Sequence, residues 1–288
     1  MAHTPRNESE KATLAARRAW CYLVLVFFSF LCLFFFYVLI INATRPHADI
    51  QKGFSFLPGS WTSLCNNFTQ VINNANIPII SGMRNSLIVS AMTAIFACYF
   101  SALTAFGIHA YRFKGRALAL TFILLIMTMP TQVSALGFVQ LMGKMNLKDS
   151  LLPLFLPSIA SPAVFYFMYQ YMQASLPLEV IEAARIDGSS EFGTFNRIVL
   201  PMIKPALAVQ AIFTFVGAWN NYFTPALILN SANKKTLPIL IAQLRSADFL
   251  KFDMGQVYMM IALSILPVII VYLFLSKFII AGVAVGGG

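Results

Sequence analysis

Four adjacent residues, Trp219-Asn220-Asn221-Tyr222, combine two kinds of side chain that suit a hydroxylated ligand. Amides donate to and accept from hydroxyl groups, and flat aromatic rings pack against the apolar faces of a sugar ring. The four residues lie in a long apolar run, where an amide facing lipid would be costly. They therefore either line a polar path or bond across to another helix, as Asn does in membrane proteins. We predict a substrate pathway here and keep helix packing as the alternative.

A second polar stretch, EAARIDGSSEFGTFNRIVLP from Glu182 to Pro201, interrupts an otherwise apolar part of the chain. Pro177 and Glu179 suit the first turn of a short helix, because proline lacks an N–H and a carboxylate complements the helix dipole. Gly188 suits the end of that helix, and either of the two serines after it can cap a second one. The sequence predicts a helix–turn–helix.

The faces of these two helices favour contact with a protein. Ala183 and Ala184 leave one side of the first helix shallow, and Glu182 and Arg185 are spaced to pair on its exposed side. An amphipathic linker on lipid headgroups is the alternative, but such linkers carry Lys and Arg on the polar face, whereas acidic residues predominate here. The second helix has an apolar edge formed by Phe192, Phe195, Ile198 and Val199.

The chain lacks the residue sets that catalysis or metal binding requires. Its cysteines and histidines are scattered and form neither a CxxC nor an HExxH pattern. The nearest approach to a phosphate-binding loop, Gly137–Met145, has one residue too many between its glycines and Met where Mg²⁺ needs Ser or Thr. The net charge of +10 comes from Lys and Arg that flank apolar spans. We predict that the chain is not an enzyme, holds no metal or cofactor of its own and binds no nucleic acid.

The composition indicates a membrane protein. Hydrophobic residues make up 59% of the chain and charged residues only 10%, whereas soluble domains carry about 25% charged residues. A helix needs about 20 apolar residues to cross a bilayer. Six apolar stretches qualify and predict an all-α, polytopic membrane protein with six transmembrane helices: Ala19–Ile41, Ser86–His109, Ala117–Met142, Leu151–Gln173, Ala206–Leu229 and Val257–Ile280.

Proline and basic residues add expectations about mobility and orientation. A proline kink is tolerated in a bilayer only where neighbouring protein or a cavity compensates, so the prolines of the last four spans favour a mobile bundle around a cavity. Lys and Arg divide almost evenly between the two sides, but those in short loops favour cytosolic N- and C-termini by the positive-inside rule. The residues that favour this orientation are Arg17, Arg18, Arg112, Lys114 and Arg116.

The Glu182 stretch resembles the EAA signature of the membrane subunits of ATP-binding cassette (ABC) importers, which reads EAA, three residues, Gly, nine residues, then I-x-L-P. The segments MRNSLIVS, FVGAWNNYFTPALIL and SKFIIAGVAVGGG are similar to the carbohydrate-uptake branch, and in particular to the maltose-type second permease subunit. The tail departs from the lysine-containing ending of that branch, so it is assigned no role. The matching signature residues are Glu182, Ala183, Ala184, Gly188, Ile198, Leu200 and Pro201.

The resemblance implies a type I ABC importer permease in a bacterial inner membrane. Residues 1–18 would be a cytosolic tail, residues 19–281 the permease domain and residues 282–288 a C-terminal tail. Within the domain, residues 42–83 would form the first extracytoplasmic loop and residues 177–205 a cytosolic loop that contacts an ATPase. The residues expected at that contact are Glu182, Ala183, Ala184, Asp187 and Gly188.

The resemblance also implies partners. These are a second permease subunit in a heterodimer, two ATPase subunits that carry ATP and Mg²⁺, an extracytoplasmic sugar-binding protein and membrane lipid. The predicted spans lack central charged residues, which favours a neutral polar substrate such as a sugar and counts against a gradient-driven secondary transporter. An ABC permease for another neutral polar solute stays open as an alternative, and which sugar is carried is not determined.

Overall fold

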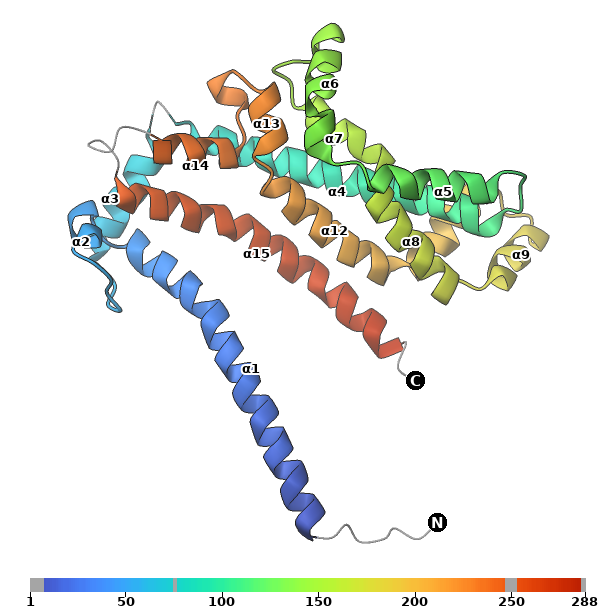
Figure 1. The fold of residues 1–288 in the computed structure, drawn as a ribbon, viewed down its shortest axis with the longest axis horizontal. Coiled ribbons are helices and arrows are strands. Elements are labelled where there is room, and N and C mark those ends of the chain that lie inside the picture. The colour runs from blue at the N-terminus through green and yellow to red at the C-terminus, as the bar shows by residue number, and fades with distance from the viewer. Residues whose placement is uncertain (1–7, 75–76, 247–252, 286–288) are drawn as a thin grey trace. The chain divides into compact units, whose positions relative to one another are not determined.

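The computed structural model describes residues 8–74, 77–246 and 253–285, and within these ranges the regular elements are helices (Figure 1). This confirms the predicted all-α class. The chain divides into two units. The first unit contains Met1–Val71 and Asp253–Ala262, and the second contains Ile72–Phe252 and Leu263–Gly288.

The elements alternate between long helices and short, broken segments. Those that begin in the first unit are α1 (Glu8–Ala43), α2 (His47–Gln51), α3 (Trp61–Ile72) and α15 (Met254–Val285). Those that begin in the second unit are α4 (Ile79–Ala110), α5 (Arg116–Met127), α6 (Thr131–Lys144), α7 (Leu152–Phe155), η1 (Leu156–Ala160), α8 (Pro162–Ser175), α9 (Leu178–Ile186), α10 (Glu191–Thr194), η2 (Phe195–Val199), α11 (Leu200–Met202), α12 (Lys204–Trp219), α13 (Phe223–Ile228), η3 (Ala232–Lys234) and α14 (Leu237–Ser246).

The described residues contain up to six candidate membrane spans if each bent helix pair counts as one span. Four continuous segments are long and apolar enough to cross a membrane, namely Thr13–Ala43, Ile79–Ala110, Leu152–Ser175 and Met254–Phe278. Two further pairs reach that length and hydropathy only together, and they bend by 99° and 80°. The pairs are Arg116–Met127 with Gln132–Lys144, and Glu191–Met202 with Lys204–Trp219.

Two of the predicted spans are interrupted, as expected from their prolines, although the fifth breaks before Pro225 and not at it. The third, Ala117–Met142, breaks because Pro130 stands as the N-cap of α6 in an extended conformation, where proline cannot continue the preceding helix. The fifth, Ala206–Leu229, breaks after Trp219, where α12 ends. Asn residues follow directly, and their side chains compete for backbone hydrogen bonds, which favours helix ends.

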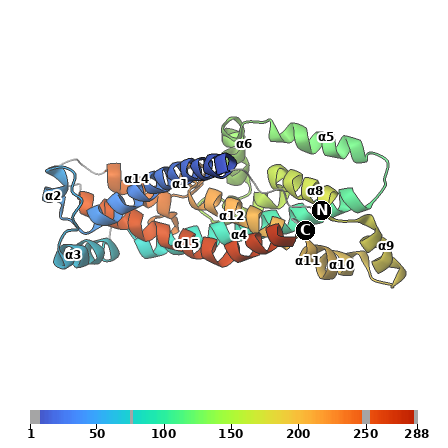
Figure 2. The same ribbon diagram turned by 90° about the horizontal axis from the view of Figure 1, so that it is seen from below.

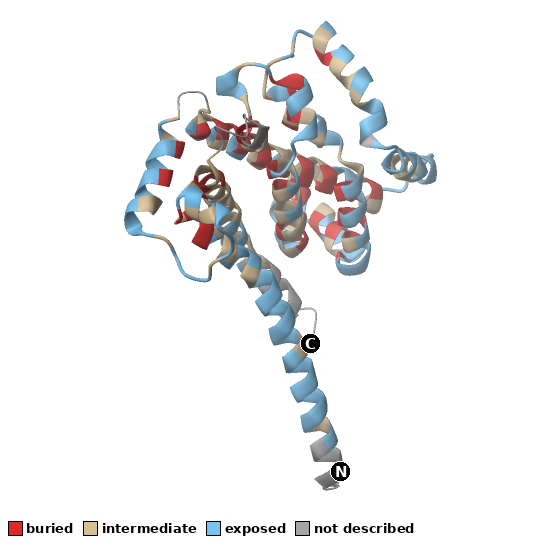
Figure 3. Ribbon diagram, turned by 60° about the vertical axis from the view of Figure 1, so that its left-hand side comes forward, coloured by how far each residue is buried: buried red, intermediate tan, exposed pale blue. Residues whose placement is uncertain are grey.

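The core of the second unit lies where α8 and α12 pack along α4. Small side chains on α4, including Ala97, Ala102 and Ala105, are at most 1% exposed and let the neighbouring backbones approach closely. Met168 of α8 and Phe195 of η2 are fully buried in the same cluster. Figure 3 shows buried positions in red, gathered where helices pack together.

One carboxylate joins two loops in the second unit. Asp149, between α6 and α7, accepts hydrogen bonds from the backbone N–H groups of Asn230 and Ser231 at 2.9 and 3.0 Å, and from the Ser231 hydroxyl. Lys234 Nζ lies 3.2 Å from the same carboxylate. The hydroxyl and backbone donors hold the pKa of Asp149 well below its ordinary value, because they stabilise the charged form. The loop after α13 is thereby fixed to the start of α7.

The first unit contains an exposed apolar helix and a polar junction. Only 6% of the most apolar window of α1 is buried, and Figure 3 shows that helix almost entirely in pale blue. After α1, the guanidinium of Arg45 donates to Asn42 Oδ1 at 3.2 Å and to the Asp49 carbonyl at 2.6 Å. Asn67 Nδ2 donates to the carbonyls of Ala43 and Arg45 at 2.9 and 3.0 Å. The predicted outer loop, residues 42–83, is thus a structured segment containing α2 and α3.

The predicted tail boundaries at residues 18 and 281 fall inside helices, and as limits of the permease domain they stay predictions. Helix α1 already begins at Glu8 and α15 continues to Val285, so residues 18 and 281 are not element ends. Residues 1–7 and Gly286–Gly288 lie outside the described part of the chain, and no role for either tail follows.

Candidate functional site

The stretch with the signature motif folds as the predicted helix–turn–helix. Helix α9 follows Pro177, and Gly188 adopts φ +77°, a left-handed conformation that glycine reaches without steric cost. The Gly188 N–H donates to the Arg185 carbonyl at 3.1 Å and the Ser189 N–H donates to the Ala184 carbonyl at 3.0 Å. This pair of bonds is a Schellman motif, which satisfies the last carbonyls of α9 and reverses the chain.

The second helix of the pair begins at a serine cap and is irregular. Ser190 Oγ accepts a hydrogen bond from the Gly193 N–H at 3.2 Å, as an N-cap does. Helix α10 then passes into the π-helical η2 and into α11, which meets α12 at the 80° bend. Figure 2 shows α9, α10 and α11 grouped at one end of α4. This arrangement connects the turn at Gly188 to the core through α12.

The exposed face of α9 differs from the prediction in one position. Glu182, Ala183, Asp187 and Gly188 are exposed, whereas Ala184 is buried. Ala184 points about 100° away from Ala183 around the helix axis, and this rotation turns it toward the core. Ile186 takes that place and is 86% exposed. Sequence reasoning missed it, although its spacing of four residues from Glu182 places both on one face.

The apolar edge of the second helix is only partly as predicted. Phe195 and Val199 are fully buried and Ile198 is half-buried, but Phe192 is 64% exposed. Helix α10 lasts a single turn before η2 begins, so the change of winding separates Phe192 from the buried face. A second large apolar side chain is therefore exposed in this loop besides Ile186.

The predicted pair between Arg185 and Glu182 does not form. Arg185 pairs with Glu191 instead. Its Nε lies 2.6 Å from Glu191 Oε1 and its Nη2 lies 3.1 Å from Oε2, and its guanidinium stacks 5.1 Å above the Tyr111 ring. The hydrogen bond from Arg185 is the main cause that lowers the pKa of Glu191, and the same bond raises the pKa of Arg185. The ion pair ties α9 to α10 across the turn. Glu182 makes no ion pair or hydrogen bond to any described residue and stays available.

The four residues proposed to line a path lie at the break between α12 and α13. Trp219 is 3% exposed and stacks on Phe215, with ring centroids 5.8 Å apart, so packing explains this residue. Asn220, Asn221 and Tyr222 are exposed. Asn221 Oδ1 accepts a hydrogen bond from the Thr224 backbone N–H at 3.4 Å. This bond is local to the start of α13 and is not the cross-helix bond that the packing alternative requires.

A small cavity of about 260 Å³ adjoins this break. It is lined by Trp219, Asn220 and Tyr222 on one side, and by Leu237 and Pro238 at the start of α14 on another. Amide and phenol groups therefore face an opening next to interrupted backbone. In a membrane, interrupted backbone is found where protein or a water-filled cavity surrounds it. A pathway at these residues stays a prediction.

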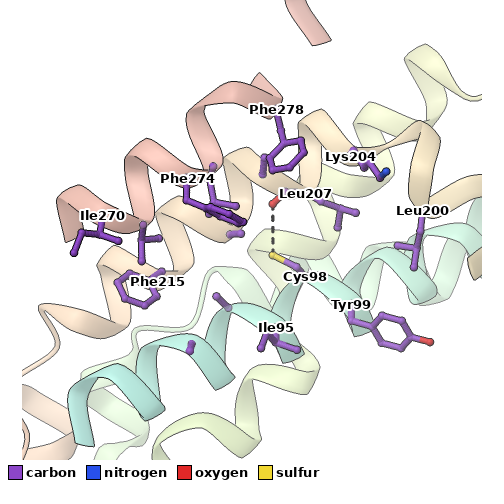
Figure 4. A pocket seen from close by; sticks show the side chains of 16 residues that line it. Ile95, Cys98, Tyr99, Leu200, Lys204, Leu207, Phe215, Ile270, Phe274 and Phe278 are labelled. Carbon is purple, nitrogen blue, oxygen red and sulfur yellow. Dashed lines mark hydrogen bonds between the residues drawn. The ribbon is translucent and has the colours of Figure 1, made fainter. Parts of the chain in front are cut away.

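A larger groove of about 790 Å³ between α4, α12 and α15 is almost wholly apolar (Figure 4). Phe215, Phe274 and Phe278 line it, and Cys98 lies at its base with Sγ 3.9 Å from the Leu207 carbonyl. Polar side chains in the lining, such as Tyr99 and Lys204, are too few to bind the many hydroxyl groups of a sugar. This groove therefore suits lipid or a helix better than a sugar.

No cluster of three or more His, Cys, Asp or Glu side chains that could hold a metal ion occurs in residues 8–74, 77–246 and 253–285. The two candidate functional features are therefore an exposed loop at one end of α4, held together by the Arg185–Glu191 ion pair, and the polar break in the chain after α12.

The family comparison fits this arrangement. A model of the binding-protein-dependent transport system inner membrane component family matches residues 99–284, which include the α9–α11 loop and the break between α12 and α13. The chain belongs to this family. The identification made from the EAA signature is thereby confirmed, and with it the prediction of a transport permease in a membrane.

Two relatives that are named as transport system permeases align with most of the chain. It is 34% identical to the arabinooligosaccharides transport system permease protein AraQ of Bacillus subtilis (strain 168), over 90% of this chain and 91% of that protein. It is 29% identical to the sn-glycerol-3-phosphate transport system permease protein UgpE of Yersinia pestis, over 91% of this chain and 94% of that protein. The fold is similar to a chain of a bacterial ABC transporter involved in the import of the acidic polysaccharide alginate, with a TM-score of 0.77 and 19% identity, over 96% of this chain and 99% of that chain.

Proposed function

We propose that this chain is a permease subunit of an ATP-driven importer for a sugar or oligosaccharide. It would form the translocation path with a second permease chain and receive its substrate from an extracytoplasmic binding protein. Two ATPase subunits, which hold ATP and Mg²⁺, would contact the loop of residues 177–205, here called the coupling loop. Both termini would then lie in the cytosol.

The observation that carries this proposal is the outer face of α9. Glu182, Ala183 and Ile186 are exposed side by side, with a charge, a small residue and an apolar anchor in one turn. Protein interfaces use such an apolar centre with a polar rim. The Schellman turn at Gly188 and the Arg185–Glu191 ion pair hold this face rigid, so movement of a docked partner passes to α12 and is not lost in the loop.

The chemistry of the break between α12 and α13 supports a neutral hydroxylated substrate. Asn220, Asn221 and Tyr222 offer amide and phenol groups. The middle of each of the four continuous spans contains no Asp, Glu, Lys or Arg, and neither does the part of α12 after Lys204. A charged substrate would need compensating charge in that low-dielectric region. The oligosaccharide named for the relative AraQ fits this reasoning better than the glycerol phosphate named for UgpE. Another neutral polar solute is the second candidate.

The test is ATP-driven uptake by proteoliposomes that contain the full chain with its copurifying partners. Labelled arabinose oligomers are compared with sn-glycerol 3-phosphate. Glu182→Ala is compared with Glu179→Ala, which removes the same charge from an exposed position on the same helix. We expect Glu182→Ala to lower uptake about tenfold, equal to roughly 1.4 kcal/mol of docking free energy, and Glu179→Ala to change it little. Uptake without any ATPase subunit, or equal uptake by the two variants, would contradict the proposal.

A further inference from the structure

A polar groove of about 850 Å³ lies behind the coupling loop. Its walls come from four places in the chain: the end of α4, the start of α5, the end of α8, and the α9–α10 segment. His109, Arg112, Arg116 and Gln173 contribute polar atoms on the side away from the coupling loop. The groove is thus a built cavity with basic groups from separate elements and is not a flat patch on one helix.

The charges in the groove do not balance. Arg185 and Glu191 both line it, but they satisfy each other in the two-pronged ion pair. Arg112 makes no ion pair or hydrogen bond with the described residues. Arg116 makes a single long contact, with Nη2 donating to the Tyr169 hydroxyl at 3.4 Å. One carboxylate, that of Glu182, remains to oppose two guanidinium groups, and it lies beyond ion-pair distance of both.

The groove lies among the ends of helices that are long and apolar enough to cross a membrane. Helix α4 ends at Ala110, α5 begins at Arg116 and α8 ends at Ser175, so three spans begin or end around it. Immediately after Arg116, the side chains of Leu118, Phe122 and Leu125 on α5 are 75%, 61% and 61% exposed. Such an apolar surface suits lipid chains, and the Arg116 guanidinium stands at its N-terminal end.

We propose that this groove binds the phosphate of an anionic phospholipid headgroup, held by Arg112 and Arg116, with the acyl chains along α5. Guanidinium groups bind phosphate oxygens through paired, charge-assisted donors. Basic pockets between membrane helices on the cytosolic side suit anionic headgroups, whereas the ammonium of a zwitterionic headgroup is repelled by the uncompensated cations. A bound headgroup lies against the Arg185–Glu191 pair and so stabilises the base of the coupling loop.

The binding test uses the intact complex in nanodiscs or detergent. Retained phosphatidylglycerol is measured by native mass spectrometry against phosphatidylcholine, without ATP or substrate. The double variant Arg112→Gln/Arg116→Gln should weaken phosphatidylglycerol binding by roughly tenfold to thirtyfold, since each basic residue that contacts the headgroup contributes about a fivefold effect. The matched control is Lys114→Gln, an exposed cation in the same loop that does not line the groove, and it should stay within about twofold of wild type. Arg112→Lys/Arg116→Lys should retain most of the preference.

Each other result would overturn the proposal. Equal binding of phosphatidylglycerol by wild type and the double glutamine variant, or equal binding of the two lipids by wild type, removes the site. Displacement of the lipid by millimolar inorganic phosphate or soluble glycerol phosphate would make it a site for soluble phosphate. The effect on uptake rests on the proposed function, but lipid binding does not. If the wild type shows no lipid preference but its uptake still depends on Glu182, only the lipid site is contradicted. If the lipid preference is present but uptake does not depend on Glu182, only the proposed function is contradicted.

Discussion

Replacing Gly188 should lower ATP-driven uptake, and the loss should grow with the free energy that the new residue needs to adopt a left-handed backbone conformation. A Cβ at this position would meet no heavy atom within 4 Å, so neighbouring side chains add nothing and the effect is purely conformational. An ordinary L-residue in the left-handed region costs about 1–2 kcal/mol. Asn tolerates this region best among them, and a β-branched residue tolerates it worst.

These costs predict a graded series. A cost of about 1–2 kcal/mol lowers the population of an intact turn by roughly 5- to 30-fold. Gly188→Asn should therefore remain near wild type, Gly188→Ala should be several-fold worse and Gly188→Val the worst. The gradation should hold both for opening of the turn and for ATP-driven uptake, because the exposed face of α9 is presented only when the turn is closed.

The opening is measured by hydrogen exchange in the complex. The reporter is the Ser189 amide, which donates to the Ala184 carbonyl in the closed turn. The control is Gly107→Ala in α4, where the added Cβ also meets open space but φ is not positive. It should leave both the exchange and the uptake unchanged. If the Asn, Ala and Val variants exchange at the same rate, or transport equally well, the left-handed turn does not constrain the loop and the reasoning fails.

Three further changes test separate contacts. The pKa of Asp149 is lowered from 3.8 in the folded chain, so its contribution to stability is complete above that pH and is lost as the pH falls through the lower folded value. Asp149→Asn should abolish this acid-dependent part of the thermal unfolding midpoint. Ser231→Ala should only reduce it, because the backbone donors of Asn230 and Ser231 remain. Gly255→Ala would place a Cβ 2.8 Å from the Arg45 carbonyl oxygen, and should destabilise the first unit by about 1–3 kcal/mol, measured by exchange of its amides; an unchanged rate would contradict the clash. Ser190→Ala removes the N-cap of α10 and should raise amide exchange there by an amount equal to about 1 kcal/mol, while unchanged exchange would mean that the cap contributes little.

Local signals in the sequence were sufficient for the turn in the coupling loop. Pro177 and Gly188 act on the residues next to them, so the bounds of α9 follow from the chain alone, whereas only the structure shows that Ser190 and not Ser189 caps α10. The partner of Arg185 does not. Glu191 reaches it only because the turn at Gly188 reverses the chain, and a helical spacing rule cannot anticipate a contact across a turn.

The number of spans was also largely available, because hydropathy is a property of composition along the chain. The breaks were harder to place. Pro130 and Asn220 each permit a helix end but do not require one, since neighbouring helices can hold a kinked helix together. Whether the helix ends there depends on what packs around it. For the same reason the sequence could not show that Trp219 packs on Phe215 while its neighbours face an opening.

The sequence by itself determined the membrane class, the helical fold, the family and the local shape of the coupling loop, because each depends on residues close together in the chain. The tertiary structure decided which side chains of that loop are presented, which spans are bent and where unbalanced charges meet. Arg112 and Arg116 were orientation signals in the sequence. They become a candidate binding site only when four separate elements close around them, since a cavity depends on packing between distant parts of the chain.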